Sequence, residues 1–154
     1  MSALSARIDL PAVPRSVVAA RRVLRELLAA WGASQDRQDA ELLATELVAN
    51  VVDHVGGDGG LSLEIVLAED WLRIAVVDGS AVRPVVQGLS GVRPRGRGLQ
   101  MVAAIATRWG VEDHSGGKRV WFDLVPAGVP AGLPSAPRGE GPGVRARQTE
   151  ESSR

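Results

Sequence analysis

The chain has 154 residues, of which 45% are apolar, so it is long and apolar enough for one domain with a hydrophobic core. It has no cysteine and two histidines, which excludes disulfide bonds and thiolate metal sites and leaves too few ligands for a structural zinc centre. The formal net charge is zero, and neither a membrane-spanning apolar run nor a secretory signal is visible. We therefore expect a cytoplasmic protein with no direct nucleic-acid or membrane partner.

The first part of the chain predicts a short edge strand followed by two helices. Residues 6–13 alternate briefly between apolar and polar types, as in a half-buried strand. Apolar residues recur at helical spacing over residues 15–31, and Gly32 is expected to end that helix. Ser34 is the expected N-cap of a second helix that runs to about Val55.

The second part predicts a hairpin, a long loop, a helix and a last strand. Alternating residues over 61–78 indicate two antiparallel strands. Residues 79–97 hold four glycines and four arginines without any period, and a loop of that length inside a domain is usually functional or disordered. A third helix is expected from Gly98 to about Trp109, and the last strand is marked by apolar residues at 120–124.

These elements predict an α+β fold, a two-layer α/β sandwich with helices on one face of a mostly antiparallel sheet. The folded domain is expected over residues 6–125. From residue 126 to residue 154 the chain is rich in Pro, Gly, Arg, Glu and Ser, which cannot bury a core, so we expect a disordered tail.

An acid and an amide lie one helical turn apart on the second predicted helix. Glu46 and Asn50 are four residues apart and share one stripe, at the edge of an apolar arc that contains Leu43 and Leu47. No cation lies three or four residues from Glu46, and Asn50 is a poor helix former in mid-helix. Both are candidate site residues, and both also fit a solvated helix face.

Asp78 ends the second strand of the predicted hairpin and is followed by Gly79-Ser80. Asp-Gly is a common turn pair, so one interpretation is structural. The other is a hydrogen-bond acceptor at a strand end that binds the exocyclic amine of a purine. The Ser80 hydroxyl could then assist through a water molecule.

Gly96-Arg97-Gly98-Leu99 opens the third predicted helix. Free N–H groups at a helix N-terminus bind phosphate, and glycines let the phosphate approach the backbone closely. A Gly-x-Gly alone also fits an ordinary hinge. It is neither a dinucleotide fingerprint nor a Walker-type P-loop, because the third glycine, the βαβ unit and the Walker spacing around Lys118 are absent.

Taken in order, these motifs resemble the Bergerat-fold ATPases. The residues that carry the resemblance are Glu46-x-x-x-Asn50, Asp78-x-Ser80, Gly96-Arg97-Gly98-Leu99 and Gly117-Lys118-Arg119-Val120-Trp121-Phe122. That superfamily includes gyrase, a heat-shock chaperone, histidine kinases and mismatch-repair ATPases. The sequence is most similar to its small bacterial branch, the anti-sigma-factor serine/threonine kinases, over roughly residues 6–125.

The resemblance implies ATP and Mg²⁺ as cofactors and a role for each motif. Glu46 would be the general base that orients the attacking hydroxyl, and Asn50 would coordinate the Mg²⁺ that bridges the phosphates. Asp78, with Ser80, would bind the adenine amine. The segment Gly96, Arg97, Gly98 and Leu99 would hold phosphate, with residues 79–97 as a lid.

Two features depart from, or add to, the family pattern. The usual Asp-x-Gly-x-Gly is Asp78-Gly79-Ser80-Ala81-Val82 here, so neither later glycine is in place and weaker nucleotide affinity is expected. Lys118 is the only lysine, and the sequence favours a surface charge at a strand end over a phosphate ligand.

The functional hypothesis is an ATP- and Mg²⁺-binding kinase that phosphorylates a serine or threonine of a small anti-anti-sigma-type protein and so controls a sigma factor. The resemblance also allows a homodimer. One alternative is a nucleotide-gated binding module without phosphoryl transfer, and another is a degenerate fold that binds its partner without ATP. Glu46 favours the kinase over the first, and Asn50 with Asp78 argues against the second.

Overall fold

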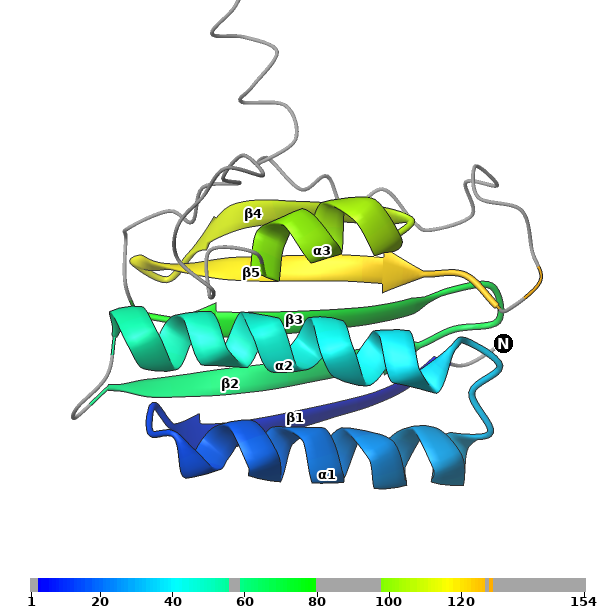
Figure 1. Cartoon of the computed structure of the whole chain (residues 1–154), viewed down its shortest axis with the longest axis horizontal. Coiled ribbons are helices and arrows are strands. Elements are labelled where there is room, and N and C mark those ends of the chain that lie inside the picture. Colours follow the sequence, from blue (N-terminus) through cyan, green and yellow to red (C-terminus); the bar gives the residue numbers. More distant parts are fainter. Residues whose placement is uncertain (1–2, 56–58, 80–97, 127, 129–154) are drawn as a thin grey trace, which may run out of the picture.

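The computed structural model describes residues 3–55, 59–79, 98–126 and 128, which form five strands and three helices (Figure 1). In chain order these are β1 (Leu4–Pro11), α1 (Arg15–Trp31), α2 (Arg37–His54), β2 (Gly60–Leu67), β3 (Leu72–Asp78), α3 (Gly98–Ile105), β4 (Arg108–His114) and β5 (Gly117–Leu124). In this part of the chain, no helix is both long enough and apolar enough to cross a membrane.

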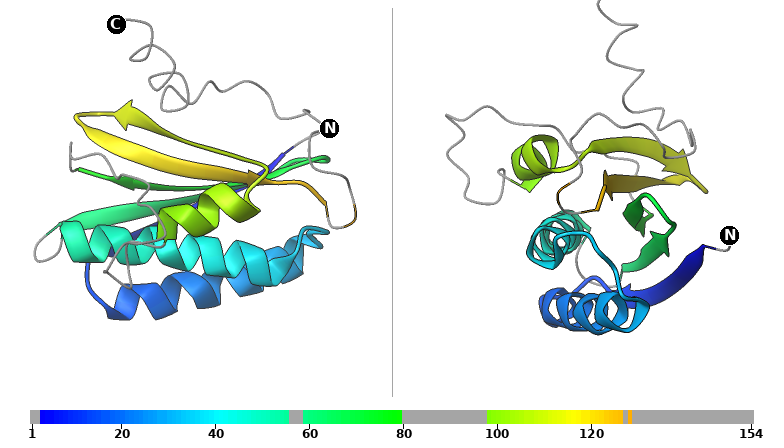
Figure 2. Two further views of the ribbon diagram at one scale, coloured as in Figure 1. Left: turned by 45° about the horizontal axis from the view of Figure 1, so that its top comes forward. Right: turned by 90° about the vertical axis from the view of Figure 1, so that its right-hand side faces the viewer.

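The strands form one sheet in the order β1-β2-β3-β5-β4, and every neighbouring pair is antiparallel. All three helices lie on one face of this sheet, which confirms the predicted two-layer α/β sandwich (Figure 2). Because β5 lies between β3 and β4 and is antiparallel to both, β3 and β4 run in the same direction. Since β3 and β5 are antiparallel, the end of β3 at Asp78 lies beside the beginning of β5 at Lys118.

The termini of the first two helices follow local chemistry. Gly32 adopts a left-handed conformation with φ of 66° and ends α1, as predicted. The predicted N-cap of α2 was wrong: the cap is Asp36, whose Oδ1 accepts a hydrogen bond from the Asp39 backbone N–H at 3.0 Å. Ser34 lies too early in the chain, because the first helical turn begins only at Arg37.

The third helix is shorter than predicted, and a strand follows it. We expected a helix to about Trp109, but α3 ends at Ile105 and Trp109 lies in β4, opposite Phe122 of β5. The apolar spacing continues into β4 and looks helical, whereas pairing with β5 determines the actual conformation. Gly110 supports this pairing, since a Cβ there would lie 2.9 Å from the Trp121 ring.

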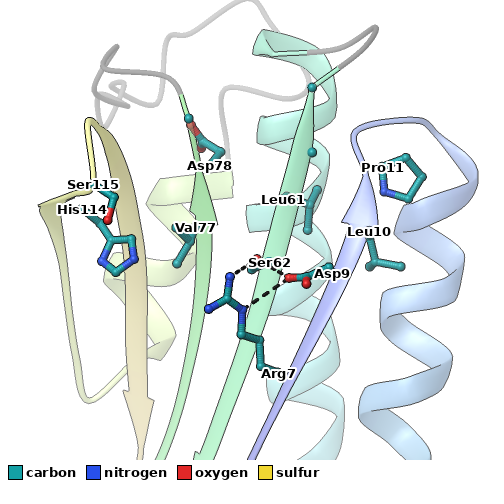
Figure 3. A pocket seen from close by; sticks show the side chains of 13 residues that line it. Arg7, Asp9, Leu10, Pro11, Leu61, Ser62, Val77, Asp78, His114 and Ser115 are labelled. Atoms are coloured by element: carbon teal, nitrogen blue, oxygen red, sulfur yellow. Dashed lines mark hydrogen bonds and ion pairs between the residues drawn. The ribbon is translucent and has the colours of Figure 1, made fainter.

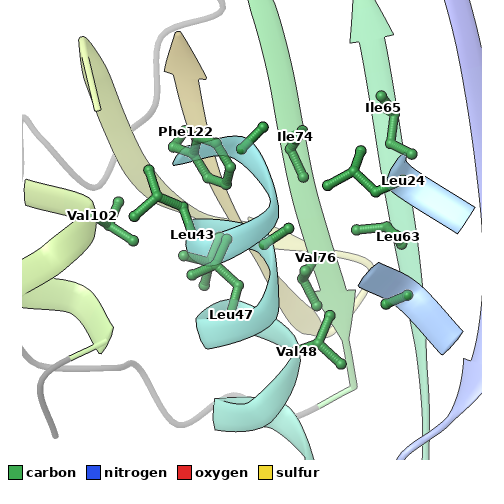
Figure 4. Close-up of a cluster of buried hydrophobic side chains, with 14 of the residues drawn as sticks. Leu24, Leu43, Leu47, Val48, Leu63, Ile65, Ile74, Val76, Val102 and Phe122 are labelled. Atoms are coloured by element: carbon green, nitrogen blue, oxygen red, sulfur yellow. The ribbon is translucent and has the colours of Figure 1, made fainter. Parts of the chain in front are cut away.

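The core lies between the helices and the sheet (Figure 4). Leu43 and Leu47 of α2 pack in the same cluster as Phe122 of β5, and Leu43 and Phe122 have no exposed surface. Val102 of α3 closes the cluster on one side and Leu24 of α1 on the other. The site residues on α2 are thus held by a helix whose opposite side is packed into the core.

The other face of the sheet carries ion pairs. Arg73 donates two hydrogen bonds to the carboxylate of Asp123, at 2.7 and 2.9 Å, and its guanidinium lies 4.1 Å from the centre of the Trp121 ring. Arg119 of β5 donates hydrogen bonds to Glu112 on the neighbouring β4 at 2.7 Å and, across β3, to Glu64 on β2 at 2.9 Å. Cross-strand pairs of this kind let a sheet present one face without a second helical layer.

Leu43→Ala should lower the free energy of unfolding by about 2–5 kcal/mol, because it opens a cavity in the core. Its neighbour Leu42 is a matched control, since the same side chain there is 38% exposed. Leu42→Ala should change stability by only about 0.5 kcal/mol. Urea unfolding followed by circular dichroism measures both values, and equal losses would contradict the described core.

Candidate functional site

Three elements bring the predicted site residues to one end of the sandwich. Asp78 is the last residue of β3, and Leu61, near the start of β2, pairs with it. Because α2 leads directly into β2, the C-terminal half of α2 lies at this end as well (Figure 1). The Asp78 end of the sheet is therefore where the motifs of α2 and β3 meet.

The N-terminus of α3 points to the same end. The chain leaves α3 and enters β4 at the opposite end of the sheet, where the Thr107 N–H donates a hydrogen bond to the Asp123 carbonyl at 2.8 Å. Gly98, the first residue of α3, consequently lies toward Asp78 rather than away from it (Figure 1). The free N–H groups of this helix start, including that of Leu99, lie where a phosphate chain would extend from a base near Asp78.

On α2, the acid and the amide lie at the boundary between core and solvent. Glu46 and Asn50 are each half-buried, whereas Leu47 between them is 2% exposed and packs in the core. The packed leucine fixes the direction of both polar side chains. His54, which the helical pattern set just inside the apolar arc, is exposed in the last turn of α2.

The strongest polar contact at this end is an ion pair between Asp78 and Lys118. The Lys118 Nζ lies 3.0 Å from each of the two carboxylate oxygens, and the two side chains are 0% and 9% exposed, respectively. The register places the two residues directly opposite each other on β3 and β5. The prediction that Lys118 is a surface charge was therefore wrong, because the register carries it onto the buried, helix-covered face of the sheet.

Gly117 allows β5 to approach the end of β3. A Cβ on Gly117 would collide with the backbone carbonyl of Asp78 and lie 2.7 Å from the Cα of Gly79. Any other residue would push the two strands apart at the point where Asp78 meets Lys118. Sequence reasoning missed the role of this Gly-Lys pair, since only the register shows that it faces Asp78.

Several predicted site residues and segments fall outside the described residues. These are Ser80, Gly96, Arg97 and the greater part of the predicted lid, together with nearly all of the predicted tail. Leu99 is described and is 3% exposed, with Val102 of the same helix fully buried. Its side chain belongs to the core, so its backbone N–H is the group that could serve the candidate site.

The described residues can share a metal ion but do not enclose one. Among them, no group of three or more His, Cys, Asp or Glu side chains gathers in one place. Mg²⁺ commonly takes one or two protein ligands and completes its shell with phosphate oxygens and water. The half-buried amide of Asn50 fits that kind of site.

An open hollow lies at the same end of the sheet, and its polar side chains Arg7, Asp9 and Ser62 lie on the face opposite α2 (Figure 3). Asp9 accepts hydrogen bonds there from the Ser62 hydroxyl at 2.5 Å and from Arg7 at 3.3 Å. The Ser62 bond, followed by the Arg7 bond, lowers the pKa of Asp9. Asp78 and Gly79 at the end of β3 also line this hollow, so it borders the candidate nucleotide site at that end of the sheet.

The comparison with known families decides which fold family this is. The sequence pattern of the histidine kinase-like ATPase domain matches residues 10–124. The chain belongs to this family. A histidine kinase-like ATPase domain is a nucleotide-binding domain, so the predicted resemblance to the Bergerat-fold ATPases is confirmed.

Two known proteins are similar to this histidine kinase-like ATPase. SCO4941, an uncharacterized protein of Streptomyces coelicolor, is 37% identical over 89 residues, which are 56% of this chain and 83% of that protein. A crystal structure of the RsbU and RsbW domains of Rv1364c from Mycobacterium tuberculosis matches with a TM-score of 0.60 and 24% identity. That match covers 86% of this chain and 35% of the other, and it concerns the fold.

Gly117→Ala should lower the free energy of unfolding by about 1–3 kcal/mol or more, because the added methyl group overlaps the Asp78 backbone. Gly79→Ala is the matched control, since a Cβ there meets nothing within 4 Å. The control should stay within about 0.5 kcal/mol of the parent protein. Urea unfolding distinguishes the two, and an unchanged Gly117→Ala protein would rule out the described approach of β5 to β3.

Proposed function

We propose that this ATPase domain binds ATP with Mg²⁺ at the Asp78 end and transfers the γ-phosphoryl group to a serine or threonine of a small partner protein. The observation that supports this most is the convergence of three motifs from distant parts of the sequence: the Glu46–Asn50 turn of α2, Asp78 at the end of β3 and the N-terminus of α3. We also propose that residues 6–125 are the functional domain.

In this proposal the nucleotide lies along the end of the helical layer. Asp78 accepts a hydrogen bond from the exocyclic amine of adenine, assisted by Ser80. The phosphates lie toward Gly96, Arg97 and Gly98 and accept hydrogen bonds from N–H groups at the start of α3. The amide oxygen of Asn50 is a metal ligand, and Mg²⁺ would neutralise the charge of the phosphates.

Glu46 is one turn from Asn50 and is the carboxylate that reaches the transferred group. Its oxygen accepts the proton of the partner's hydroxyl, and the hydroxyl oxygen forms a bond to the γ-phosphorus as the bond to ADP breaks. The products are a phosphoserine or phosphothreonine, ADP and a proton held first by Glu46. The half-buried position of Glu46 keeps its side chain directed to the site, because the adjacent Leu47 is anchored in the core.

The proposed partners come from the anti-sigma-factor branch that the motifs resemble. The substrate would be a small anti-anti-sigma-type protein. The kinase would bind either this protein or a sigma factor, and phosphorylation of the small protein would determine which of the two it binds. The fold likeness to a structure that contains an RsbW domain supports this choice of partner class. A homodimer in the cytoplasm is part of the same proposal.

Asn50→Ala should lose Mg²⁺-dependent ATP binding and keep its fold, because Asn50 lies at the edge of the core. Gln38→Ala is the matched control, since it removes an exposed carboxamide from the first turn of the same helix. Calorimetric titration with ATP, with and without Mg²⁺, measures the effect. Unchanged Mg²⁺–ATP affinity in a folded Asn50→Ala protein would remove the central claim.

Glu46→Gln should bind ATP nearly as well as the parent protein and transfer phosphate roughly 10²–10⁴-fold more slowly, because it keeps the shape of the side chain and loses its basicity. Glu41→Gln on the same helix is the control, because its carboxylate bonds Arg25 of α1 instead of facing the site. Radiolabel transfer to the co-purified partner is the measurement. If the parent protein binds ATP but labels no serine or threonine, the nucleotide-gated binding module replaces the kinase.

A further inference from the structure

The ammonium of Lys118 lies at the base end of the proposed nucleotide site. It donates a hydrogen bond to Oδ1 of Asp78, the carboxylate assigned to the adenine amine, and lies 3.0 Å from Oδ2 as an ion pair. Both side chains lie on the helix-covered face of the sheet. In the described part of the chain, Asp78 is the only carboxylate within ion-pair distance of Lys118. The base of a bound nucleotide would therefore meet a carboxylate and an ammonium side by side.

Stability alone does not account for this pair. Two buried charges lose their hydration, and their attraction often does no more than offset that cost, so an apolar pair of similar size would serve the fold as well. Lys118 is also the only lysine in a chain whose other basic side chains are arginines. The pair thus fits a role in recognition better than one in stability.

The donors and acceptors of the pair match one edge of adenine. An ammonium has three N–H donors, and one of them bonds Oδ1 of Asp78, so a further donor can serve another acceptor. Along its Watson–Crick edge, adenine presents an N–H donor on its exocyclic amine next to an acceptor at the ring nitrogen N1. Asp78 can accept the first while Lys118 donates to the second.

We propose that Lys118 is a second base-reading residue, which donates a hydrogen bond to N1 of adenine while it shares Asp78 with the exocyclic amine. The inference rests on the proposed nucleotide site and adds a determinant of its base selectivity. It also distinguishes Lys118 from a phosphate ligand, because the ammonium is held at the base carboxylate and the phosphates lie toward α3.

The test compares ATP with 1-deaza-ATP, in which a C–H group replaces N1 and the amine is kept. Calorimetry on the full chain with Mg²⁺ should find 1-deaza-ATP bound roughly 10- to 100-fold more weakly, the usual effect of losing a hydrogen bond to a charged donor. Lys118→Met should bind the two nucleotides with nearly equal affinity. Arg119→Met, the same change of cation to Met on the opposite face of β5, should keep the parent's ratio.

A second measurement needs no variant, in case Lys118→Met does not fold. Since the chain has a single lysine, ¹⁵N-lysine labelling gives one side-chain ammonium resonance, that of Lys118. ATP should shift this resonance clearly more than 1-deaza-ATP does, because only ATP offers the N1 acceptor.

Equal shifts, equal affinities of the parent protein for the two nucleotides, or a parent-like ratio in folded Lys118→Met would overturn the role of Lys118 and leave the proposed ATP site standing. A parent protein that binds neither nucleotide would instead refute the proposed site, and the inference with it. Loss of affinity for both nucleotides by the same factor in Lys118→Met would indicate a phosphate contact or a structural pair, and would also overturn the inference.

Discussion

The end of this sheet is organised by the buried ion pair between Asp78 and Lys118. The carboxylate and the ammonium face each other from neighbouring strands, so this pair forms when β3 and β5 adopt the observed register. Breaking such a pair from one side typically costs about 3–5 kcal/mol. Gly117 makes the register possible, because a side chain there would collide with the Asp78 backbone. The site is therefore built on a constraint between two strands.

The two faces of the sheet are stabilised in different ways. On one face, three helices cover the apolar side chains of the sheet. On the other, arginines such as Arg73 and Arg119 bond carboxylates across the strands, so that face needs no further layer. The proposed nucleotide site lies on the helical side, where a boundary between core and solvent exists.

Helix α2 carries both core residues and candidate site residues. Leu43 and Leu47 anchor it in the core, and Glu46 and Asn50 lie on the adjacent stripe at the edge. A helix so anchored cannot rotate without exposing its leucines, which keeps the acid and the amide directed to the site. Core substitutions on α2 are therefore expected to affect the geometry of the site as well as the stability of the domain.

The sequence by itself determined the elements whose signals are local: the helical period of α1 and α2, the αL glycine at position 32, the alternation of β2 and β3, and the spacing of Glu46 and Asn50. Their periods or conformations depend on neighbouring residues alone. Only the tertiary structure decided the strand identity of Trp109, the burial of Lys118 and the closeness of Gly117 to Asp78. Each of these depends on pairing with β5 or on its register, and strand pairing between distant segments leaves no periodic trace in the residues that it joins.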